Sequence, residues 1–559
     1  MLSSRRAHLD DPLRSERSCV LGRGGMVATS VPAASEAGLQ VLREGGNAMD
    51  AAIAAAAVLC VVEPMMTGIG GDAFVLLWSQ QEGRLLGLNG SGRAPSGHHL
   101  EHFRELGIEQ IAPAGILSAT VPGAVHAWET LHRRLGRLPF ARLLEPAARL
   151  AEEGFPVSEL VAHYWKLTVA LGALRNEAAR RSWTVDGAAP AAGTLFRAPG
   201  LARVLREIAE GGAQAFYEGR AAQAILRASR EEGGGFTAAD LTGHASTWVE
   251  PVTTTFRGTT VAELPPNGQG LTALLALNIL ECFDPADAPV GSALEWHRRI
   301  ESIKLAFADR DAYIADPDHS AVPVEALLSK DYARKRASLV GDKALPLASP
   351  GLGGDTTYLC TADAEGNLVS FIQSLFTAFG SGVGCGDTDI VLQSRGAGFR
   401  MDPTHPNALA PGKRPLHTII PGMLLEHDVA KVAFGLMGGD VQPQSHLNFV
   451  ANVVDHGCNV QEALDRPRFR VDRGAQVRIE APQALLPEGG HLGAALQLRG
   501  HEVVEPGAAM ADRFGGGQAI ALLANGVLAG GSDRRKDGCA LPLTLPAPGR
   551  SRSRSKASR

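Results

Sequence analysis

The sequence predicts an α+β protein, because strand-type and helix-type segments occupy separate blocks of the chain. Three blocks support this prediction. Two β-type runs flank the short segment Ala364-Glu365-Gly366, residues 115–240 are mostly amphipathic helix, and residues 247–263 return to a strand-like composition. With 559 residues and 45% hydrophobic content, the chain can bury a sizeable core and has the length for several domains.

The two β-type runs form a predicted hairpin from which the rest of the chain is interpreted. Val, Ile, Phe, Tyr and Thr favour strands, and a short Gly-containing loop between two such runs is typical of a hairpin. A three-residue loop pairs Asp363 with Asn367, and counting along the ladder then places Thr356 opposite Ser374. Their Cβ atoms would lie about 4.5–5.5 Å apart. A slip of one residue would place Leu375 there instead.

A threonine at the start of a strand, after the flexible pair Gly353-Gly354, has a specific chemical use. If the bond between Asp355 and Thr356 were cut, Thr356 would carry both a hydroxyl and a free α-amine. An α-amino group titrates at about 7.7–8.0, so part of it is neutral near pH 7 and can accept the hydroxyl proton. Thr356 would then be nucleophile and base in one residue. On composition alone, an ordinary surface hairpin that begins Thr-Thr explains the same residues.

The N-terminal block contains two predicted helices and a glycine-rich turn. Residues 35–44 form the first helix, which Gly45-Gly46 ends, and Asn47 is the N-cap of an Ala-rich helix that runs to Cys60. The glycines of residues 68–71 lack the GxGxxG spacing, and no Lys-Ser/Thr follows them. A tight turn that permits close packing is therefore a better interpretation than a phosphate-binding loop.

Further helices follow from apolar residues at helical spacing, and we expect them at residues 121–128, 143–153, 271–280 and 296–313. Asp309 and Arg310 lie in the last of these helices. For both residues a structural ion pair is a better expectation than substrate binding. Residues 318–355 are rich in Pro, Gly and Ser and are expected to form an irregular connector that moves after cleavage.

Composition argues against several classes of partner and cofactor. The formal net charge is −5, so no broad basic surface indicates a nucleic-acid partner. The seven cysteines are scattered without a CxxC pair, and no His/Cys cluster has zinc spacing, so neither disulfides nor a metal site are expected. The longest apolar run, residues 51–62, is too short to span a membrane. The N-terminus has no apolar h-region, and we expect a cytoplasmic protein.

The segment Asp355-Thr356-Thr357-Tyr358 through Phe379-Gly380-Ser381-Gly382 resembles the start of the small subunit of the γ-glutamyltransferase family. The resemblance covers roughly residues 24 to 545, with further matching motifs at residues 412–418 and 434–440. Members of this family are N-terminal-nucleophile hydrolases, made as one chain that cleaves itself before a Thr. The resemblance therefore implies a four-layer αββα sandwich of two stacked, mainly antiparallel sheets with helices on both outer faces.

The resemblance also divides the chain. It implies an N-terminal extension at residues 1–23, a large chain at 24–355, a small chain at 356–545 and a basic tail at 546–559. Cleavage between Asp355 and Thr356 would leave the two chains together as a heterodimer with one shared core. The tail has a low-complexity basic sequence, for which a solvated disordered end is the expectation over contact with nucleic acid or lipid.

The family's catalytic residues are matched here one by one. The resemblance makes Thr356 the nucleophile and Ser374 the residue that positions its hydroxyl. It assigns Gly438 and Gly439 to the oxyanion hole, since a Gly-Gly turn can present two backbone N–H groups to one point. It implies no metal and no organic cofactor.

The substrate-binding positions differ from those of the true γ-glutamyl enzymes. Ser91 replaces the Arg that binds the substrate's α-carboxylate, and Phe376 replaces an Asn. Gly398 replaces the Asp that binds the α-ammonium, and His417-Thr418 replaces a Ser-Ser pair. A pocket built to hydrogen-bond an amino-acid head group loses much of its discrimination when those partners are absent.

These changes favour an anionic substrate. An Arg is suited to hold a carboxylate, and Arg395 stands in the segment that lost its Asp. We expect a small amide with a carboxylate and no required α-ammonium, as for the oxamate amidohydrolases and the cephalosporin-acylase branch that these motifs resemble. Arg93 and Arg395 are candidate carboxylate clamps, and His417 and Thr418 are further candidate substrate contacts. Either Arg could instead be structural or solvated. The alternatives are a glutathione hydrolase with a remodelled pocket and an uncleaved, non-catalytic scaffold.

Overall fold

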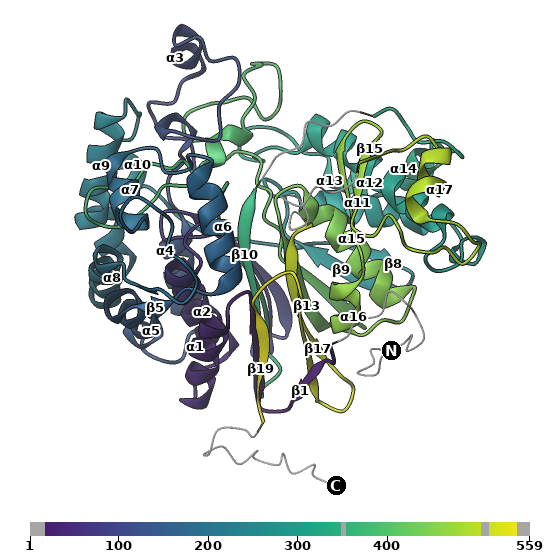
Figure 1. Ribbon diagram of the computed structural model, residues 1–559, viewed down its shortest axis with the longest axis horizontal. Coiled ribbons are helices and arrows are strands. Elements are labelled where there is room, and N and C mark those ends of the chain that lie inside the picture. Colours follow the sequence, from purple (N-terminus) through teal and green to yellow (C-terminus); the bar gives the residue numbers. More distant parts are fainter. Residues whose placement is uncertain (1–16, 348–353, 505–513, 545–559) are drawn as a thin grey trace.

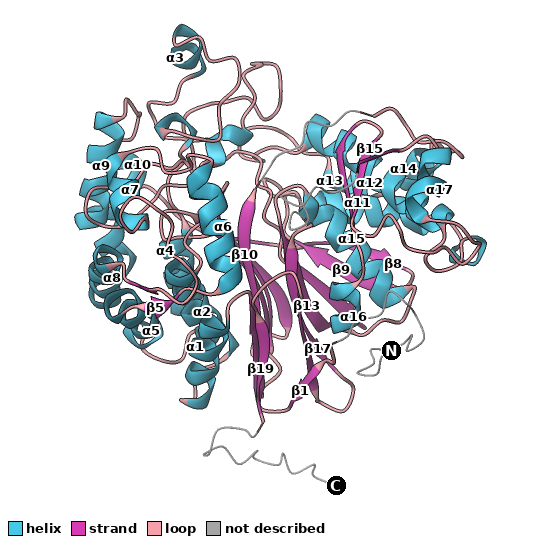
Figure 2. Cartoon of the chain, in the orientation of Figure 1, coloured by secondary structure: helices cyan, strands magenta, loops and turns pink. Residues whose placement is uncertain are grey.

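Two seven-stranded antiparallel sheets stack against each other, with helices over both outer faces (Figures 1 and 2). This computed structural model describes residues 17–347, 354–504 and 514–544. It confirms the predicted αββα sandwich. The predicted basic tail at 546–559 and most of the predicted N-terminal extension lie outside the described residues.

The first sheet, here called sheet I, contains the predicted hairpin. Its strand order is β19 (Cys539–Leu543), β2 (Gly25–Thr29), β10 (Asp355–Asp363), β11 (Leu368–Phe376), β3 (Asp72–Ser79), β4 (Arg84–Asn89) and β7 (Thr247–Val249). Sheet I therefore contains strands that precede residue 356 and strands that follow it, with β2 between β19 and β10. The inner pair β10 and β11 is flanked on both sides by earlier segments, β2 and β3.

The second sheet, sheet II, has the order β1 (Val20–Gly22), β18 (Leu528–Ser532), β17 (Gly516–Leu522), β13 (Val429–Met437), β12 (Gly422–Glu426), β9 (Thr259–Glu263) and β8 (Val252–Phe256). Its β1 begins inside the segment predicted as an N-terminal extension, so residues 20–22 are part of the sandwich. Two small sheets complete the strands: β14 (Phe469–Arg473), β15 (Gln476–Ile479) and β16 (Glu502–Val504), and β5 (Phe155–Pro156) with β6 (Leu195–Phe196).

Most helices from the first half of the chain cover sheet I, the short α3 lies apart at the top of the view, and later helices cover sheet II (Figure 1). The first group is α1 (Pro32–Arg43), α2 (Ala48–Val62), α3 (Leu100–Glu105), α4 (Ala124–Leu135), α5 (Phe140–Glu153), α6 (Glu159–Ala170), α7 (Glu177–Trp183), α8 (Pro199–Glu218), α9 (Arg220–Glu231) and α10 (Ala238–Thr242). The second is α11 (Gly270–Glu281), α12 (Ala293–Tyr313), α13 (Val324–Leu328), α14 (Lys330–Ala337), α15 (Val441–Val454), α16 (Val460–Asp465) and α17 (Leu492–Leu498). Among the described residues, no helix combines the length and apolar character needed to cross a membrane.

Helix α2 shows how local sequence positions these layers. The Asn47 side chain accepts the N–H of Asp50 at 2.9 Å, and the Asp50 carboxylate accepts the N–H of Asn47 at 3.1 Å. This capping box satisfies two amides that the helix start would otherwise leave unpaired. All residues of α2 are buried, which explains its Ala-rich composition between sheet I and the outer helices. The predicted cap and helix are confirmed, and the helix extends to Val62.

The segment predicted as an irregular connector contains two helices, so that prediction was wrong for residues 324–337. Ser329 caps α14 by accepting the N–H of Tyr332 at 3.2 Å, and the Ala, Lys and Arg residues that follow are good helix formers. Residues 348–353 of the connector lie outside the described residues. The neighbours Asp309 and Arg310 each form an ion pair, but with different partners, because adjacent residues on a helix do not face each other.

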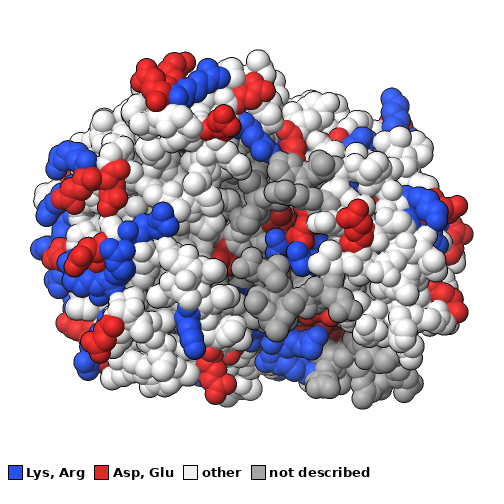
Figure 3. Space-filling view, turned by 45° about the horizontal axis from the view of Figure 1, so that its top comes forward, with Lys and Arg blue, Asp and Glu red and all other residues white. Residues whose placement is uncertain are grey.

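Alternation along β10 and β11 divides their side chains between two cores. Tyr358, Cys360 and Ile372 belong to the cluster between the two sheets, whereas Leu359 and Phe371 face the helices over sheet I. Successive side chains of a strand point to opposite faces. The even-numbered positions of this hairpin therefore face sheet II. On the face drawn in Figure 3, acidic and basic side chains are intermixed.

Candidate active site

The hairpin of β10 and β11 has the predicted loop. Asp363 N donates to Asn367 O at 3.2 Å, and the ladder continues to the pair Thr357 and Gln373. The Asp363 carboxylate also accepts the N–H of Glu365 at 2.9 Å and that of Asn367 at 3.1 Å, which fixes the turn. The three-residue loop and this register are confirmed.

At its open end the hairpin departs from regular pairing. Asp355 pairs with Phe376, so a bulge leaves Ser374 and Leu375 together facing Thr356. Bulges occur often beside active sites, where they redirect a side chain. Here the Thr356 hydroxyl lies 3.3 Å from the Ser374 hydroxyl, so the two predicted catalytic side chains are in contact.

The Ser374 hydroxyl uses all of its hydrogen-bonding capacity. It donates to the carbonyl oxygen of Asp355 at 2.8 Å and accepts the N–H of Phe376 at 2.7 Å. It also accepts a hydrogen bond from the Thr356 hydroxyl, which fills the one donor and two acceptor positions of a serine hydroxyl. Ser374 therefore holds the carbonyl of the Asp355–Thr356 bond and the hydroxyl of Thr356 at the same time.

The predicted Gly438-Gly439 turn lies at the start of helix α15. Both glycines have positive φ, 121° and 62°, which L side chains rarely adopt. The Gly438 carbonyl accepts the N–H of Val441 at 3.2 Å, and in a trans peptide the N–H of Gly439 points the opposite way. A Cβ placed on Gly354 would lie 3.4 Å from that Gly439 nitrogen. The turn thus packs against the backbone just before Thr356, where the helix N-terminus favours negative charge.

A buried polar network supports this turn from behind. Gln269 Nε2 donates to Gly439 O at 3.1 Å and to Thr418 O at 2.8 Å. Gln269 Oε1 accepts from Arg310 Nη1 at 3.0 Å, and Arg310 also pairs with Asp440 at 2.7 Å. Arg310 therefore positions the turn through Gln269, which is a structural role and not substrate binding.

Gln442 is a residue near Thr356 that sequence reasoning missed. Its Nε2 lies 3.5 Å from Thr356 Oγ1, and its Oε1 accepts the N–H of Ile420 at 2.9 Å. The second contact fixes which end of the amide faces the threonine. The available signal was position: Gln442 stands in the first turn of the helix that follows the Gly-Gly pair.

Arg395, His417 and Thr418 come together beneath the hairpin. Arg395 Nη1 donates to Thr418 Oγ1 at 2.8 Å, and its Nε lies 3.2 Å from Asp72 Oδ2, which also bonds His417 Nε2. All four side chains are buried. Burial alone would raise the pKa of Asp72, but the neighbouring Arg395 and His417 hold it below its usual range. Arg395 Nη2 and Asp72 Oδ1 have no hydrogen-bond partner among the described residues. Asp72 was not a sequence candidate.

Arg93 lies apart from this cluster. Its guanidinium is 3.1 Å from Asp318 and 3.6 Å from Asp316, and it donates to Gly412 O at 3.0 Å. Its side chain is 36% exposed. Arg93 and Arg395 are thus two separate cations with carboxylate partners of their own.

A cavity of about 230 Å³ opens beside Thr356. Drug-sized ligands occupy roughly 300–1,000 Å³, so this cavity suits a small substrate. Helix α6, which lies beside the upper end of β10 in Figure 1, supplies an apolar wall. The lining residues are Met66, Tyr164, Leu167, Thr168, Leu171, Gly354, Asp355, Thr356, Thr377, Ala378, Met437, Gly438, Arg470, Gly515 and Lys536.

One buried group has the composition of a metal site. His297, Glu301 and His501 bring their ligand atoms within 4.8 Å of one another, although no such spacing was visible in the sequence. His297 Nδ1 bonds His501 Nε2 at 2.8 Å, and His297 Nε2 bonds Gly341 O at 2.8 Å. The Lys304 ammonium lies 2.7 Å from Glu301. Because Lys304 already supplies a cation to the carboxylate, these residues fit a structural polar cluster better than a metal centre.

A threonine hydroxyl at the start of an inner strand, between two stacked antiparallel sheets and beside a Gly-Gly turn, defines an N-terminal-nucleophile hydrolase. The Gamma-glutamyltranspeptidase family matches residues 34–543. The chain belongs to this family and is a proenzyme hydrolase.

Relatives within the family differ in what they hydrolyse. The chain is 40% identical over 528 residues to the glutathione hydrolase-like YwrD proenzyme of Bacillus subtilis, covering 94% of this chain and 99% of that protein. It is 38% identical over 527 residues to the oxamate amidohydrolase proenzyme of Klebsiella pneumoniae, covering 92% and 98%. The crystal structure of cephalosporin acylase from Bacillus halodurans superposes with a TM-score of 0.88 at 43% identity, covering 96% and 98%.

Proposed function

We propose that this protein is a self-processing amidohydrolase that hydrolyses a small, carboxylate-bearing amide through an acyl-enzyme on Thr356. The observation that carries the proposal is the double contact of Ser374, which accepts the Thr356 hydroxyl and donates to the carbonyl of Asp355. This places the nucleophile, the bond to be cut and a hydrogen-bond donor for the carbonyl oxygen at one point.

Processing follows from this contact. Thr356 Oγ1 attacks the carbonyl carbon of Asp355, and the Ser374 hydroxyl stabilises the negative charge that forms on the carbonyl oxygen. The C–N bond breaks, the nitrogen becomes the α-amine of Thr356, and an ester links Asp355 to Thr356 Oγ1. Water hydrolyses the ester to a carboxylate and a free hydroxyl. Because β2 and β3 flank β10 and β11 in sheet I, the large and small chains remain paired as a heterodimer.

Turnover in the mature enzyme uses the same groups. The new α-amine accepts the proton of the Thr356 hydroxyl, which attacks the substrate amide. The N–H groups of Gly438 and Gly439, at the N-terminus of α15, stabilise the tetrahedral oxyanion, and one such donor contributes about 2.7–4 kcal/mol. Gln442 orients the hydroxyl from the other side. The leaving amine departs, and water releases the acid from the acyl-enzyme.

Two features support a substrate without an α-ammonium. A Cβ at Gly398 would lie 2.9 Å from Leu416 O, so the acidic side chain of the γ-glutamyl enzymes has no room there. Ser91 is buried and donates to Asn89 at 2.6 Å, which gives it a structural partner. The carboxylate-clamp roles of Arg93 and Arg395, and the substrate contacts of His417 and Thr418, stay predictions. A cytoplasmic location, and the expected lack of cofactor, metal, nucleic-acid and membrane partners, also stay predictions.

A glutathione hydrolase is the second candidate function, favoured by the 40% identity to the glutathione hydrolase-like protein of Bacillus subtilis. Glutathione assayed beside oxamate and a glutaryl amide separates the two. A non-catalytic scaffold predicts no cleavage at all, and the similarity to several proenzymes argues against it.

The first experiment compares the wild type with Thr356→Ala on a denaturing gel. Wild type is expected to give two fragments, the smaller beginning Thr-Thr-Tyr-Leu, and Thr356→Ala a single chain. Thr357→Ala is the matched control, because the Thr357 hydroxyl bonds Gln373 O at 3.3 Å within the regular ladder and should be dispensable for cleavage. A single chain in all three proteins would overturn the proposal.

A further inference from the structure

A nearly buried lysine lines the cavity that contains Thr356. Lys536 lies in the turn between β18 and β19, and only 7% of its side chain is exposed. Because a buried ammonium loses its hydration, its partners in the cavity decide whether it is stable there.

The contacts of the Lys536 ammonium are incomplete. Its Nζ lies 3.7 Å from Glu63 Oε1 and 4.7 Å from the centroid of the Tyr164 ring. A lysine ammonium has three N–H donors, and none makes a hydrogen bond of 3.5 Å or shorter to another residue of the described part of the chain. The cavity next to Nζ is therefore where its missing hydrogen-bond acceptor would bind.

Glu63 compensates the lysine only in part. Burial raises the pKa of Glu63, and the opposing effects of Lys536 and of the Ser30 hydrogen bond do not cancel this. Its Oε2 is already engaged by the Ser30 hydroxyl at 2.5 Å. The charged form of Glu63 is thus less favoured than in water, and an anion in the cavity would give Lys536 a second, closer countercharge.

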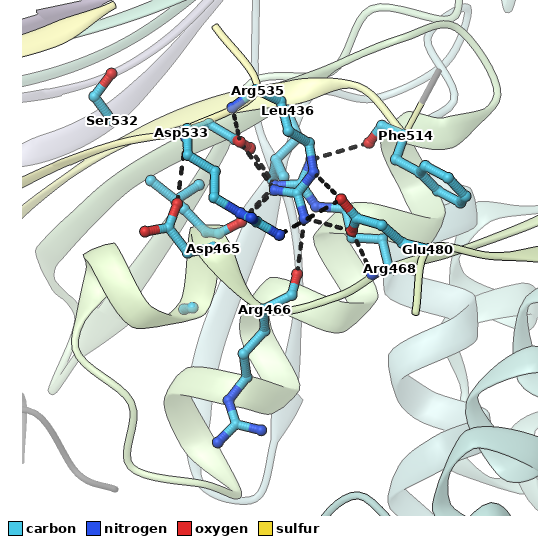
Figure 4. Close-up of polar contacts among 12 residues, drawn as sticks. Leu436, Asp465, Arg466, Arg468, Glu480, Phe514, Ser532, Asp533 and Arg535 are labelled. Atoms are coloured by element: carbon cyan, nitrogen blue, oxygen red, sulfur yellow. Dashed lines mark hydrogen bonds and ion pairs between the residues drawn. The ribbon is translucent and has the colours of Figure 1, made fainter. Parts of the chain in front are cut away.

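The turn that carries Lys536 is held firmly. Figure 4 shows Asp533 and Arg535 within a cluster of ion pairs: Arg468 bonds Asp533, and Arg535 bonds Asp533 at 2.9 Å and Glu480 at 2.8 Å. Lys536 N then donates to Asp533 O at 3.1 Å. A binding group fixed by its supporting contacts loses little freedom when ligand arrives.

The sheet and helix on either side of this turn leave space for the lysine stem. A Cβ on Gly516 would lie 2.6 Å from Lys536 Cγ, so the glycine lets the stem lie against β17. On the opposite side, Asp537 accepts the N–H of Leu160 at 3.2 Å, which joins the turn to helix α6. Lys536 is therefore placed between sheet II and the apolar wall of the cavity.

The cavity lies on the acyl side of the reacting bond. Gly354 and Asp355, the acyl part of the bond cut in processing, line it together with Lys536 and Arg470. After cleavage, the acyl group of a substrate would take their position. Arg470 already has a close carboxylate partner, Asp472, at 2.7 Å, whereas the Lys536 ammonium lies 3.7 Å from Glu63.

We propose that Lys536 binds a carboxylate carried by the acyl group of the substrate and so selects half-amides of short dicarboxylic acids. The inference rests on the proposed amidohydrolase function and adds the residue that recognises the anion. It assigns the carboxylate to the wall formed by α6 and the 533–538 turn, away from Arg93 and from the buried Arg395.

Binding is tested first, because it needs no turnover. The processed wild type is heated with oxalate or glutarate, and with sodium chloride at equal ionic strength. We expect the dicarboxylates to raise Tm in wild type and Lys536→Arg, and not in Lys536→Met. Arg534→Gln, two residues away with a side chain that is 57% exposed, is the control and should respond like wild type. An equal rise in wild type and Lys536→Met, or no rise in wild type, would overturn the proposal.

Kinetics then measure specificity. Initial rates are compared for oxamate and its neutral analogue oxamide. Lys536→Met should raise KM for oxamate about 10- to 100-fold, the effect of losing a hydrogen bond between charged groups, with a much smaller change for oxamide. Arg93→Gln tests the competing clamp and should leave KM for oxamate near the wild-type value.

The outcomes separate this inference from the proposed function. A wild type that processes itself and hydrolyses both compounds with equal KM keeps the amidohydrolase and rejects the lysine site. A selective KM rise in Arg93→Gln but not in Lys536→Met also rejects it. If Lys536→Met is not processed, Lys536→Gln replaces it in both assays. The binding assay on wild type also remains a test, because a dicarboxylate that leaves the wild-type Tm unchanged rejects the site.

Discussion

Asp72 and Ser374 are direct cross-strand partners on β3 and β11. Directly opposed residues share one face of a sheet, so the Asp72 carboxylate lies beside the hydroxyl that bridges Thr356 and the carbonyl of Asp355. Asp72 in turn contacts Arg395 and His417. The buried charge cluster and the reacting groups are therefore neighbours on adjacent strands of sheet I.

Ser374→Ala should slow self-cleavage. The substitution removes the donor to the Asp355 carbonyl and leaves the N–H of Phe376 without its acceptor. By comparison with oxyanion donors in other enzymes, the cleavage rate should fall about 10²- to 10³-fold. Densitometry of the precursor band over time measures this. Ser374→Thr keeps a hydroxyl and should recover part of the rate, whereas equal rates for Ala and Ser would contradict the assignment.

Gln442→Leu should lower kcat more than it changes KM. Its Nε2 contact to Thr356 is long, 3.5 Å, and acts on the nucleophile rather than on the bound substrate. Loss of one neutral hydrogen bond predicts about a 3- to 10-fold decrease in kcat. Steady-state kinetics on processed enzyme provide the measurement. A change confined to KM would instead make Gln442 a substrate contact.

Asp72→Asn should destabilise the fold at pH 7 by about 3–5 kcal/mol, because Arg395 keeps a buried charge without its counterion. The folded-state pKa of Asp72 is below its unfolded value, so its stabilisation is present above that unfolded value. It is lost as pH falls through the folded-state pKa. The free energy of unfolding is measured with denaturant on the Thr356→Ala precursor, with and without Asp72→Asn. The two values should become equal below about pH 4.

The exposed ion pair of Arg93 provides the matched control for this measurement. Asp318→Asn removes a carboxylate with 58% side-chain exposure and should cost less than about 1 kcal/mol. If Asp72→Asn cost no more than Asp318→Asn, the buried pair would not stabilise the site.

Acid should destabilise the protein through buried histidines, of which His244 is a clear example. His244 stacks on Tyr217 at 5.5 Å, and burial, with nearby positive charge, lowers its pKa to about 3. In the unfolded chain this histidine binds a proton near pH 6.5. Between pH 6.5 and about 3 the unfolded state therefore holds more protons than the folded state, and the free energy of unfolding decreases as the pH is lowered. The slope is about 1.4 kcal/mol per pH unit.

His244→Phe keeps the ring and removes the titration. Its free energy of unfolding, measured on the Thr356→Ala precursor, should therefore depend on pH less steeply than that of the parent by one proton over this range. Parallel pH dependences would show that His244 titrates normally in the folded chain.

Local signals were sufficient to predict two features. Loop length and alternation determine the hairpin, and Asn47 with Asp50 determines the start of α2. The bulge at Thr356 was not predictable. It depends on Phe376, whose φ of 81° is rare for a residue with a side chain, and whose ring packs 4.9 Å from the Arg395 guanidinium.

The residues missed around the site reach it through packing between distant segments. Asp72 enters through strand pairing, and Gln442 through the placement of α15. Lys536 enters through a turn anchored on Glu480 and Arg468 by way of Asp533 and Arg535. None of these contacts leaves a period or a spacing in the sequence, whereas the glycine turn and the threonine have recognisable motifs.

Sheet I interleaves strands from before and after the cut, with β2 against β10 and β3 against β11. The uncut chain folds this sheet as one molecule, but two separated pieces would have to find each other first. Self-cleavage thus turns a unimolecular folding reaction into a bimolecular one, whose recovery depends on concentration. In the heterodimer proposed here, a slow rate of unfolding would keep the two chains together, and the intact bond between Asp355 and Thr356 would be needed only for the first folding of the chain.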